Sequence, residues 1–385
     1  MERTLRLYPW WCLLQSALFW QPVFVLWFST HLEPDDVLRL EALYFGAVVL
    51  LEVPSGILAD RIGRRPLLVA SSLGWGLGAA VMAAATDVGM LALGQLLLAA
   101  AMALGSGADT ALHADALIAT GKGDELGARE ARARGFALAG LAISGAVGGL
   151  LGAIDLQTAY LASAASGLAA AGVAWRLREP PRAPRPPRAP PSWSLLRDPV
   201  VRWVLAASVV LMVLVHVPYE LLQPWLSLAL GAPWTPPLAG GLVGIAMGLG
   251  AVAASRADAL ARRIGATYAV IGSLVLQVVV IVGMGLVQHP TLVVVVALRS
   301  IGFAVAEPVL LAAIHPRLRS DQRATWLSVQ SLAGRLAFSG SLVVVASTTS
   351  DVWSSATMWQ VAMPYAGLGA LAIGMLALTR PRELG

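Results

Sequence analysis

The stretch "LADRIGRR", Leu58–Arg65, interrupts a long apolar run with four charged residues between Asp60 and Arg65. A related stretch, "LARRIG" at Leu260–Gly265, repeats its outline in the second half of the chain. A short pattern that recurs at the same place in two comparable halves indicates an internal duplication. We therefore interpret the sequence as two copies of one unit, the alternative being chance recurrence of a short basic loop.

The composition is that of a membrane protein. Of the 385 residues, 57% are hydrophobic and 13% are charged, whereas soluble domains are roughly 45–50% apolar and 25% charged. A membrane-crossing helix needs about 20 mostly apolar residues, and the sequence predicts twelve such segments, at 9–30, 38–59, 66–86, 89–113, 135–155, 157–177, 199–223, 237–260, 266–287, 291–314, 324–348 and 357–379. Barrel strands would be shorter and would alternate in polarity. The predicted fold class is all-α and integral to the membrane, with twelve transmembrane helices in two pseudo-symmetric six-helix bundles.

The basic residues orient the predicted helices. All but three of the 27 Lys and Arg residues lie near the termini or near the alternate loops that follow the even-numbered helices, the exceptions being Arg39, Arg299 and Arg335. Loops rich in Lys and Arg stay in the cytoplasm, so we expect a multi-pass protein of the inner (plasma) membrane with both termini cytoplasmic. Anionic lipid accounts for the pI near 9.9, and no nucleic-acid partner is expected.

A proline-rich stretch, "EPPRAPRPPRAPPSW" at Glu179–Trp193, separates the first six predicted helices from the last six. Proline forbids helix there and favours an extended, stiff segment. We therefore predict an N-terminal bundle over 1–178, a linker over 179–198 and a C-terminal bundle over 199–385. Parallel repeats of this kind are one architecture of secondary transporters, with the substrate held between the halves.

The opening stretch resembles the loop signature of the major facilitator superfamily, GxxxDRxGRR, through Gly56, Asp60, Arg61, Gly63, Arg64 and Arg65. The resemblance covers the whole chain. The stretches "LEVPSGILADRIGRR", "GSGADTAL" and "DQRATWLSVQSLAGRL" resemble bacterial drug/proton antiporter-type efflux members. It implies a cytoplasmic gate in which Asp60 contacts the start of the eleventh helix, near Arg323–Thr325. Arg64 would pair with an acid near the end of the fourth helix, for which Asp115 is the candidate.

The alternative to a gate is a simple topology anchor, which explains the arginines but not Asp60 or the two glycines. In the second copy Arg262 replaces the acid, so a weaker latch is expected there.

The predicted fifth helix contains "GLAISGAVGGLLG", Gly140–Gly152. It resembles the antiporter signature of the superfamily, with Ser144 and Gly145 in place of Gly-Pro and with Gly148 and Gly149 kept. Small residues let membrane helices approach closely, so helix packing is expected at these positions. Ordinary small-residue packing is the alternative to an antiporter feature.

Ionisable residues inside predicted spans are costly unless they face a partner or a wet cavity. The candidates for proton coupling or for lining the substrate cavity are Glu52, Asp109, His113, His216, Glu220, Arg299, Glu307 and Arg335. The resemblance implies that helices 1, 4, 7 and 10 line the central cavity. Residues four apart share a helix face, so Asp109 with His113, and His216 with Glu220, could exchange protons; solvation at the membrane edges is the alternative.

Two further alternatives concern the same spans. Glu307 and Arg335 could form a purely structural pair or take part in binding, and Glu52 could belong to the gate. Trp10 and Trp11 are typical of interface anchors, whereas Trp20, Phe24 and Trp27 supply either stacking or packing surface. A single cysteine, Cys12, excludes an internal disulfide and a multi-cysteine metal site.

The function predicted from these patterns is secondary transport by alternating access, with a small lipophilic or amphipathic compound exported in exchange for protons by a monomer. No phosphate loop and no HExxH or GxSxG sequence is present, so no enzyme, cofactor or metal is expected. The superfamily's RxxQG signature is missing because no Arg precedes Gln95 in that pattern. The alternatives are import or facilitated diffusion of a metabolite, such as an anion attracted by Arg299 and Arg335, and a non-transporting receptor or assembly partner.

Overall fold

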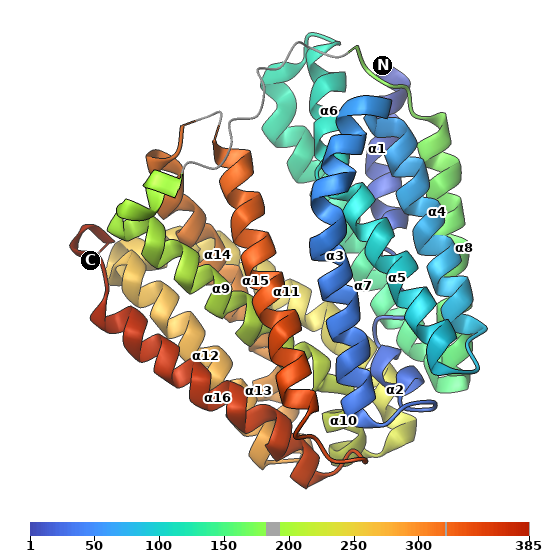
Figure 1. Ribbon diagram of the computed structural model, residues 1–385. Helices are drawn as coiled ribbons and strands as arrows, with labels where there is room; N and C mark the ends of the chain where they lie inside the picture. The colour runs from blue at the N-terminus through green and yellow to red at the C-terminus, as the bar shows by residue number, and fades with distance from the viewer. Residues whose placement is uncertain (182–192, 320–321, 385) are drawn as a thin grey trace. The chain divides into compact units, whose positions relative to one another are not determined.

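The protein is described by a computed structural model that covers residues 1–181, 193–319 and 322–384, without the side chains of Asp60, Arg323 and Ala324. In this part of the chain every regular element is a helix (Figure 1). Contacts divide the chain into unit 1, Met1–Pro184 with Pro233–Gly244, and unit 2, Arg185–Ala232 with Ile245–Gly385. Most of the predicted linker, residues 182–192, lies outside the described residues.

The helices of unit 1 are α1 (Glu2–Gln15), α2 (Phe24–Phe28), α3 (Pro34–Ile62), α4 (Arg64–Ala83), α5 (Val88–Gly105), α6 (Ala108–Ile118), α7 (Leu126–Ile154) and α8 (Leu156–Arg176). Those of unit 2 are α9 (Pro199–Glu220), α10 (Leu222–Leu230), α12 (Ala266–Leu286), α13 (Val293–Ala297), α14 (Arg299–Ile314), α15 (Arg323–Ala346) and α16 (Ser355–Leu378). One helix, α11 (Thr235–Ile264), contributes its first residues to unit 1 and the remainder to unit 2. Short 3-10 turns complete the described elements, namely η1 (Gly123–Glu125), η2 (Trp193–Arg197), η3 (Ala232–Trp234), η4 (Pro290–Leu292), η5 (His315–Arg317) and η6 (Arg382–Leu384).

Ten helical segments of the described chain are long and apolar enough to cross a membrane. The all-helical membrane class is thus confirmed, whereas the count of twelve stays a prediction. The two expected spans outside the ten are 9–30 and 157–177. The second coincides with α8, a helix of 21 residues rich in Ala, Gly and Ser, whose small side chains carry less hydropathy than Leu or Val.

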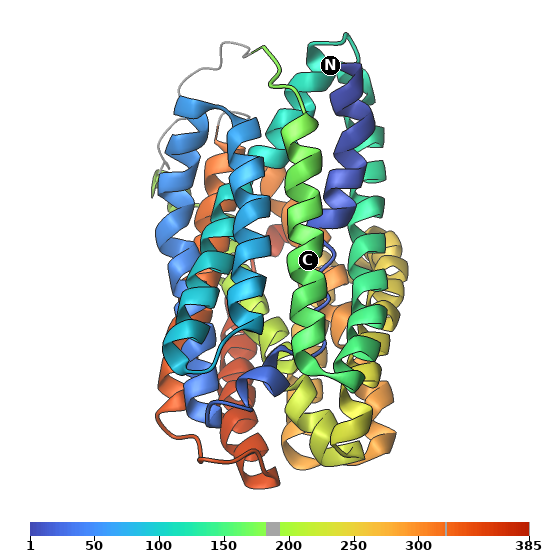
Figure 2. The same cartoon turned by 90° about the vertical axis from the view of Figure 1, so that its right-hand side faces the viewer.

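The other of these spans, 9–30, is interrupted. Helix α1 ends at Gln15, and Ser16–Val23 forms irregular turns before α2 begins (Figure 2). Pro22 lies in this segment and cannot donate a backbone hydrogen bond. Ser163 of α8 accepts a hydrogen bond from the Trp20 amide at 3.0 Å, and Ser166 of the same helix donates to the Leu14 carbonyl at 2.8 Å. Irregular backbone at membrane depth needs such partners from neighbouring helices.

The two units share several pairings of helices. In unit 1, α4 packs against α5 and α8, and α1 packs against α7; in unit 2, α12 packs against α14 and α16, and α9 packs against α15. Figures 1 and 2 both show α4 beside α8. Gly76 and Gly167 permit that approach, because a Cβ at Gly167 would lie 2.5 Å from the Gly76 nitrogen. Recurrence of the pairings agrees with the duplication inferred from the sequence.

The repeated loops share one backbone feature. Gly63 separates α3 from α4 with a φ of 102°, and Gly265 separates α11 from α12 with a φ of 89°. Residues with a Cβ rarely adopt this left-handed region, whereas glycine enters it freely. The glycine in both "RIG" sequences is therefore required by the sharp turn between consecutive helices.

Candidate functional site

The signature loop forms a buried ion pair with the end of α6. Arg64, the first residue of α4, pairs through Nη1 with the Asp115 carboxylate, and the same nitrogen donates to the Ala111 carbonyl at 2.8 Å. The Asp115 side chain is 4% exposed and that of Arg64 is 16% exposed. Two residues that the sequence analysis proposed as partners are thus adjacent, in a setting where water provides little screening.

A third acid, Glu179, binds the start of the same helix. Its carboxylate accepts hydrogen bonds from the backbone amides of Arg64 and Arg65, at 2.9 and 2.7 Å. The first amides of a helix have no partner within it and carry partial positive charge, so a carboxylate stabilises them. Glu179 was assigned to the linker, and sequence reasoning missed this role because its partners lie more than a hundred positions earlier.

Arg65 completes this arrangement. Its guanidinium donates to the Trp175 carbonyl at 2.6 Å and lies over the Trp175 ring, 5.1 Å from the centroid. Of the other signature residues, Gly56 lies inside α3 and Arg61 is exposed near its end. The side chain of Asp60, and those of Arg323 and Ala324 in its expected contact, are outside the described set.

His113 lies in a second buried cluster with a different partner from the one expected. Its ring is 1% exposed, contacts the Glu130 carboxylate of α7 through Nδ1, and stacks on Tyr8 with 4.1 Å between ring centroids. Asp109, one turn earlier on α6, is half-buried. The sequence placed Glu130 in a cytoplasmic loop, so the imidazole–carboxylate contact became visible only when α6 and α7 packed together.

Truncation of Glu130 to Ala is expected to destabilise the protein by about 1–3 kcal/mol, because it leaves a buried imidazole nitrogen without its acceptor. Glu130→Gln keeps a hydrogen-bonding group and should lose less. Thermal unfolding in detergent, followed by size-exclusion chromatography after heating, measures both variants. Equal losses for Ala and Gln would contradict a hydrogen-bonding role for this carboxylate.

A buried carboxyl–amide pair joins α3 to α5. Gln95 donates from Nε2 to Glu41 at 2.8 Å, and the residues are 4% and 6% exposed. Within the described chain no cationic partner is recorded for Glu41. Sequence reasoning missed it because it lies close to the predicted membrane edge, among acids that water could solvate. Glu52, farther along α3, is half-buried.

The predicted charged residues of unit 2 lie on three neighbouring helices. Arg299 begins α14 and lies 5.8 Å from the Tyr219 ring centroid of α9. His216 contacts the Met212 carbonyl at 2.8 Å and packs against Phe338 of α15.

The remaining predicted residues of this unit differ in burial. Glu220 is 4% exposed at the end of α9, Glu307 is exposed on α14, and Arg335 is half-buried on α15.

The glycine-rich helix α7 meets two other segments within unit 1. An added Cβ at Gly140 or Gly148 would overlap a backbone carbonyl oxygen, that of Leu13 in α1 or that of Phe19 in the irregular segment. On another side, a Cβ at Gly145 would lie 3.1 Å from Val243, and Gly149 faces the Pro236 carbonyl. Ser144 is fully buried between these positions. Side chains at the four glycines would prevent these close approaches.

The tryptophans near the chain start differ in environment. Trp10 is 55% exposed, as an interface anchor should be, but Trp11 is 3% exposed and donates to Ser72 at 3.0 Å. The prediction that Trp11 faces the interface is wrong, because α4 covers it. Trp20 stacks between Trp75 and Tyr160 within unit 1.

Comparison with known proteins identifies the family. The model of the Major Facilitator Superfamily matches residues 14–341. The chain belongs to this superfamily. Among curated proteins, none matches. The superfamily match, together with ten membrane-length apolar helices, describes a multi-pass membrane protein that is a transporter rather than an enzyme.

Solved structures of superfamily transporters share the fold. A mutant of the nucleoside transporter NupG has a TM-score of 0.78 at 16% identity, covering 98% of this chain and 99% of that one. A D-xylose–proton symporter scores 0.72 at 12% identity, over 98% and 97% of the two chains. A bacterial homologue of the human lysosomal transporter Spinster scores 0.70 at 15% identity, over 98% and 95%. At such identities the likeness concerns the fold alone.

Proposed function

We propose that this superfamily member is a proton-coupled exporter of a small lipophilic or amphipathic compound, working by alternating access as a monomer in the plasma membrane. The observation that carries proton coupling is the Glu41–Gln95 pair, a carboxyl group buried inside a membrane span with a neutral partner. An intramembrane acid of this kind is a functional candidate by default, because its ionised form is costly there.

Protonation of Glu41 decides whether unit 1 contains a buried charge beside Gln95. Gain or loss of this charge can bias an equilibrium between two conformations, provided that the two conformations expose Glu41 to different extents. Export is supported by the likeness of α7 to the superfamily's antiporter signature, at glycines that meet backbone in this fold. Import by symport is the second candidate, favoured by a fold shared with a D-xylose–proton symporter.

The Arg64–Asp115 pair and Glu179 support a gating role for the signature loop. They hold the α3–α4 turn against α6 and against the chain after α8. In the proposed cycle this end of unit 1 moves as one body, and Asp60 makes and breaks the contact that closes the cytoplasmic side. The proposal retains the six-plus-six division, with bundles over 1–178 and 199–385.

Reconstituted vesicles with an imposed pH gradient test the coupling. We expect gradient-driven movement of lipophilic fluorescent compounds, with protons moving in the opposite direction, and we expect Glu41→Gln to abolish the response to the gradient while substrate exchange at equal pH persists. Glu33→Gln, an exposed acid that precedes the same helix, is the matched control and should behave as the wild type.

Three other outcomes would each contradict one element of the proposal: export by exchange, the role of Glu41, or transport itself. Protons and substrate moving together would indicate symport and overturn export by exchange. A pH response retained in Glu41→Gln would assign coupling to another of the candidate acids. Absence of transport for every compound in a broad panel would favour the receptor alternative.

A further inference from the structure

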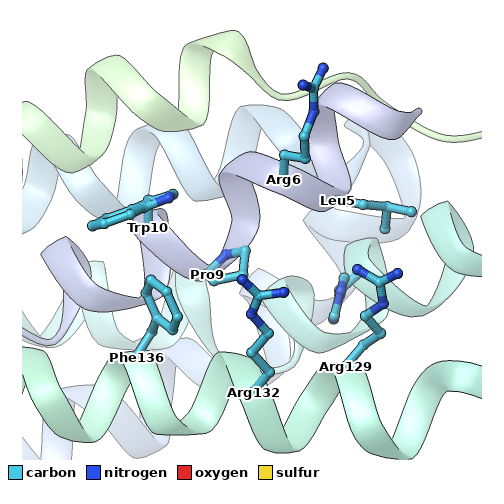
Figure 3. Close-up of a pocket in the computed structure, with 8 residues that line it drawn as sticks. Leu5, Arg6, Pro9, Trp10, Arg129, Arg132 and Phe136 are labelled. Atoms are coloured by element: carbon cyan, nitrogen blue, oxygen red, sulfur yellow. The ribbon is translucent and has the colours of Figure 1, made fainter.

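A cavity of about 240 Å³ lies between α1, α6 and α7 in unit 1 (Figure 3). Its apolar walls include Leu5, Pro9, Trp10 and Phe136, and arginines line it as well. It is smaller than the roughly 300–1,000 Å³ pockets that enclose drug-sized ligands. A cavity of this volume can hold the polar part of a larger molecule, while the rest of that molecule lies outside the cavity.

Two arginines of α7 face this cavity together. In Figure 3 the guanidinium groups of Arg129 and Arg132 both extend from α7 toward α1, whereas that of Arg6 points away from α7. Arg132 lies 5.9 Å from the Phe136 ring centroid, and the described chain gives it no carboxylate partner. A planar guanidinium can donate two parallel hydrogen bonds to the oxygens of a phosphate group.

Three acids near the cavity already have partners. Glu125 contacts both Nε and Nη2 of Arg129, at 2.9 and 2.8 Å, and Nη1 is the nitrogen of that guanidinium outside this pair. Glu130 contacts His113, and Glu2 forms an ion pair with Lys122 at 2.6 Å that lowers the pKa of the Glu2 carboxyl. Arg132 therefore presents a guanidinium to the cavity that has no carboxylate partner within the described chain.

An apolar strip leads away from the arginines along α7. Trp10 meets Phe136 edge-on, with 5.1 Å between centroids, and is exposed as tryptophans at membrane interfaces are. Beyond Phe136, on the same side of the helix by spacing, the side chains of Ile143, Val147 and Leu150 are exposed. A free phosphate ion makes no contact with this apolar strip, whereas the acyl chain of a lipid can lie along it.

We propose that the cavity binds the phosphate of an anionic phospholipid through Arg129 and Arg132, with an acyl chain along α7. Under the positive-inside expectation the lipid belongs to the inner leaflet. The site is separate from the Glu41–Gln95 pair, so its existence does not depend on the proposed transport function.

Native mass spectrometry tests the site on protein held in micelles that contain equal amounts of phosphatidylglycerol and phosphatidylethanolamine. Wild type should retain phosphatidylglycerol selectively. The double variant Arg129→Gln, Arg132→Gln should bind it roughly thirty-fold more weakly, given about 1 kcal/mol for each arginine near an anionic lipid. The control Arg176→Gln, Arg178→Gln removes two exposed arginines of unit 1 outside the cavity and should bind as the wild type does.

Three results would overturn the proposal: equal losses in both double variants, equal retention of the two lipids, or inorganic phosphate displacing phosphatidylglycerol at matched concentration. The last result would indicate a solute site instead. Should the double Gln variant fail to elute as folded protein, Arg129→Lys with Arg132→Lys keeps both charges without the planar fork. Intermediate retention of phosphatidylglycerol by that variant supports the site, and unchanged retention contradicts recognition by the guanidinium pair.

Discussion

Replacement of Arg64 by Gln is expected to destabilise the protein by about 3 kcal/mol, at the low end of the range for breaking a buried ion pair. The Asp115 carboxylate, 4% exposed, would remain in place without its guanidinium. Because the Arg64 side chain is 16% exposed, water can reach the site and hydrogen bond to the Asp115 carboxylate in the variant. The loss of stability should therefore stay below the upper end of the range for a buried pair. The Ala111 carbonyl also loses a donor.

The double variant Arg64→Gln, Asp115→Asn removes both charges and should be less destabilised than the sum of the single variants, since residues in direct contact are not additive. The control is Arg262→Gln in the second copy, where the pair with Asp258 is 68% and 80% exposed. Exposed pairs contribute about 0–1 kcal/mol, so this variant should unfold close to wild type. Thermal unfolding in detergent measures the four variants and the wild type.

An Arg64→Gln protein no less stable than the Arg262→Gln control would refute the burial argument. Gating predicts a further effect on transport, because a weakened cytoplasmic latch changes the population of the two states. Equal loss of stability and of transport across the series would favour a purely structural pair over a gate.

Substitution of Gly148 by Ala is the second change with a large expected effect. The added Cβ would overlap the Phe19 carbonyl, with the Phe19 carbonyl carbon only 2.8 Å away. These are backbone atoms of a segment that hydrogen bonds already hold to α8, and they cannot rotate aside as a side chain does. Overpacking a well-packed site costs about 1–3 kcal/mol, and we expect the upper end here.

The same helix provides a control of opposite sign. Gly135 of α7 has no atom within 4 Å of an added Cβ and is exposed, so Gly135→Ala should gain about 0.5–1 kcal/mol from the higher helix propensity of alanine. Unfolding of the two Ala variants should therefore move in opposite directions from the wild type. Stabilisation by both substitutions would mean that α7 does not approach Phe19 as closely as the structure describes.

The arrangement of Glu41, Glu130 and Glu179 shows why parts of the site were not predictable. In the sequence, Glu41 lies near a predicted membrane edge, Glu130 in a predicted loop and Glu179 in the predicted linker. Nothing in the local pattern distinguishes them from other acids. Their partners are Gln95, His113 and the amides of Arg64 and Arg65, which come from other helices. Which helix faces which is not encoded in local periodicity, so the partners became evident only in the packed unit.

The sequence by itself determined the membrane class, the helical character of the apolar runs and the family, because hydropathy, segment length and motif residues can be read locally along the chain. Only the tertiary structure decided where α1 breaks, that His113 pairs with Glu130 instead of Asp109, and that the glycines of α7 meet backbone. These features depend on contacts between residues distant in sequence, and such contacts exist only when several helices bury their surfaces together.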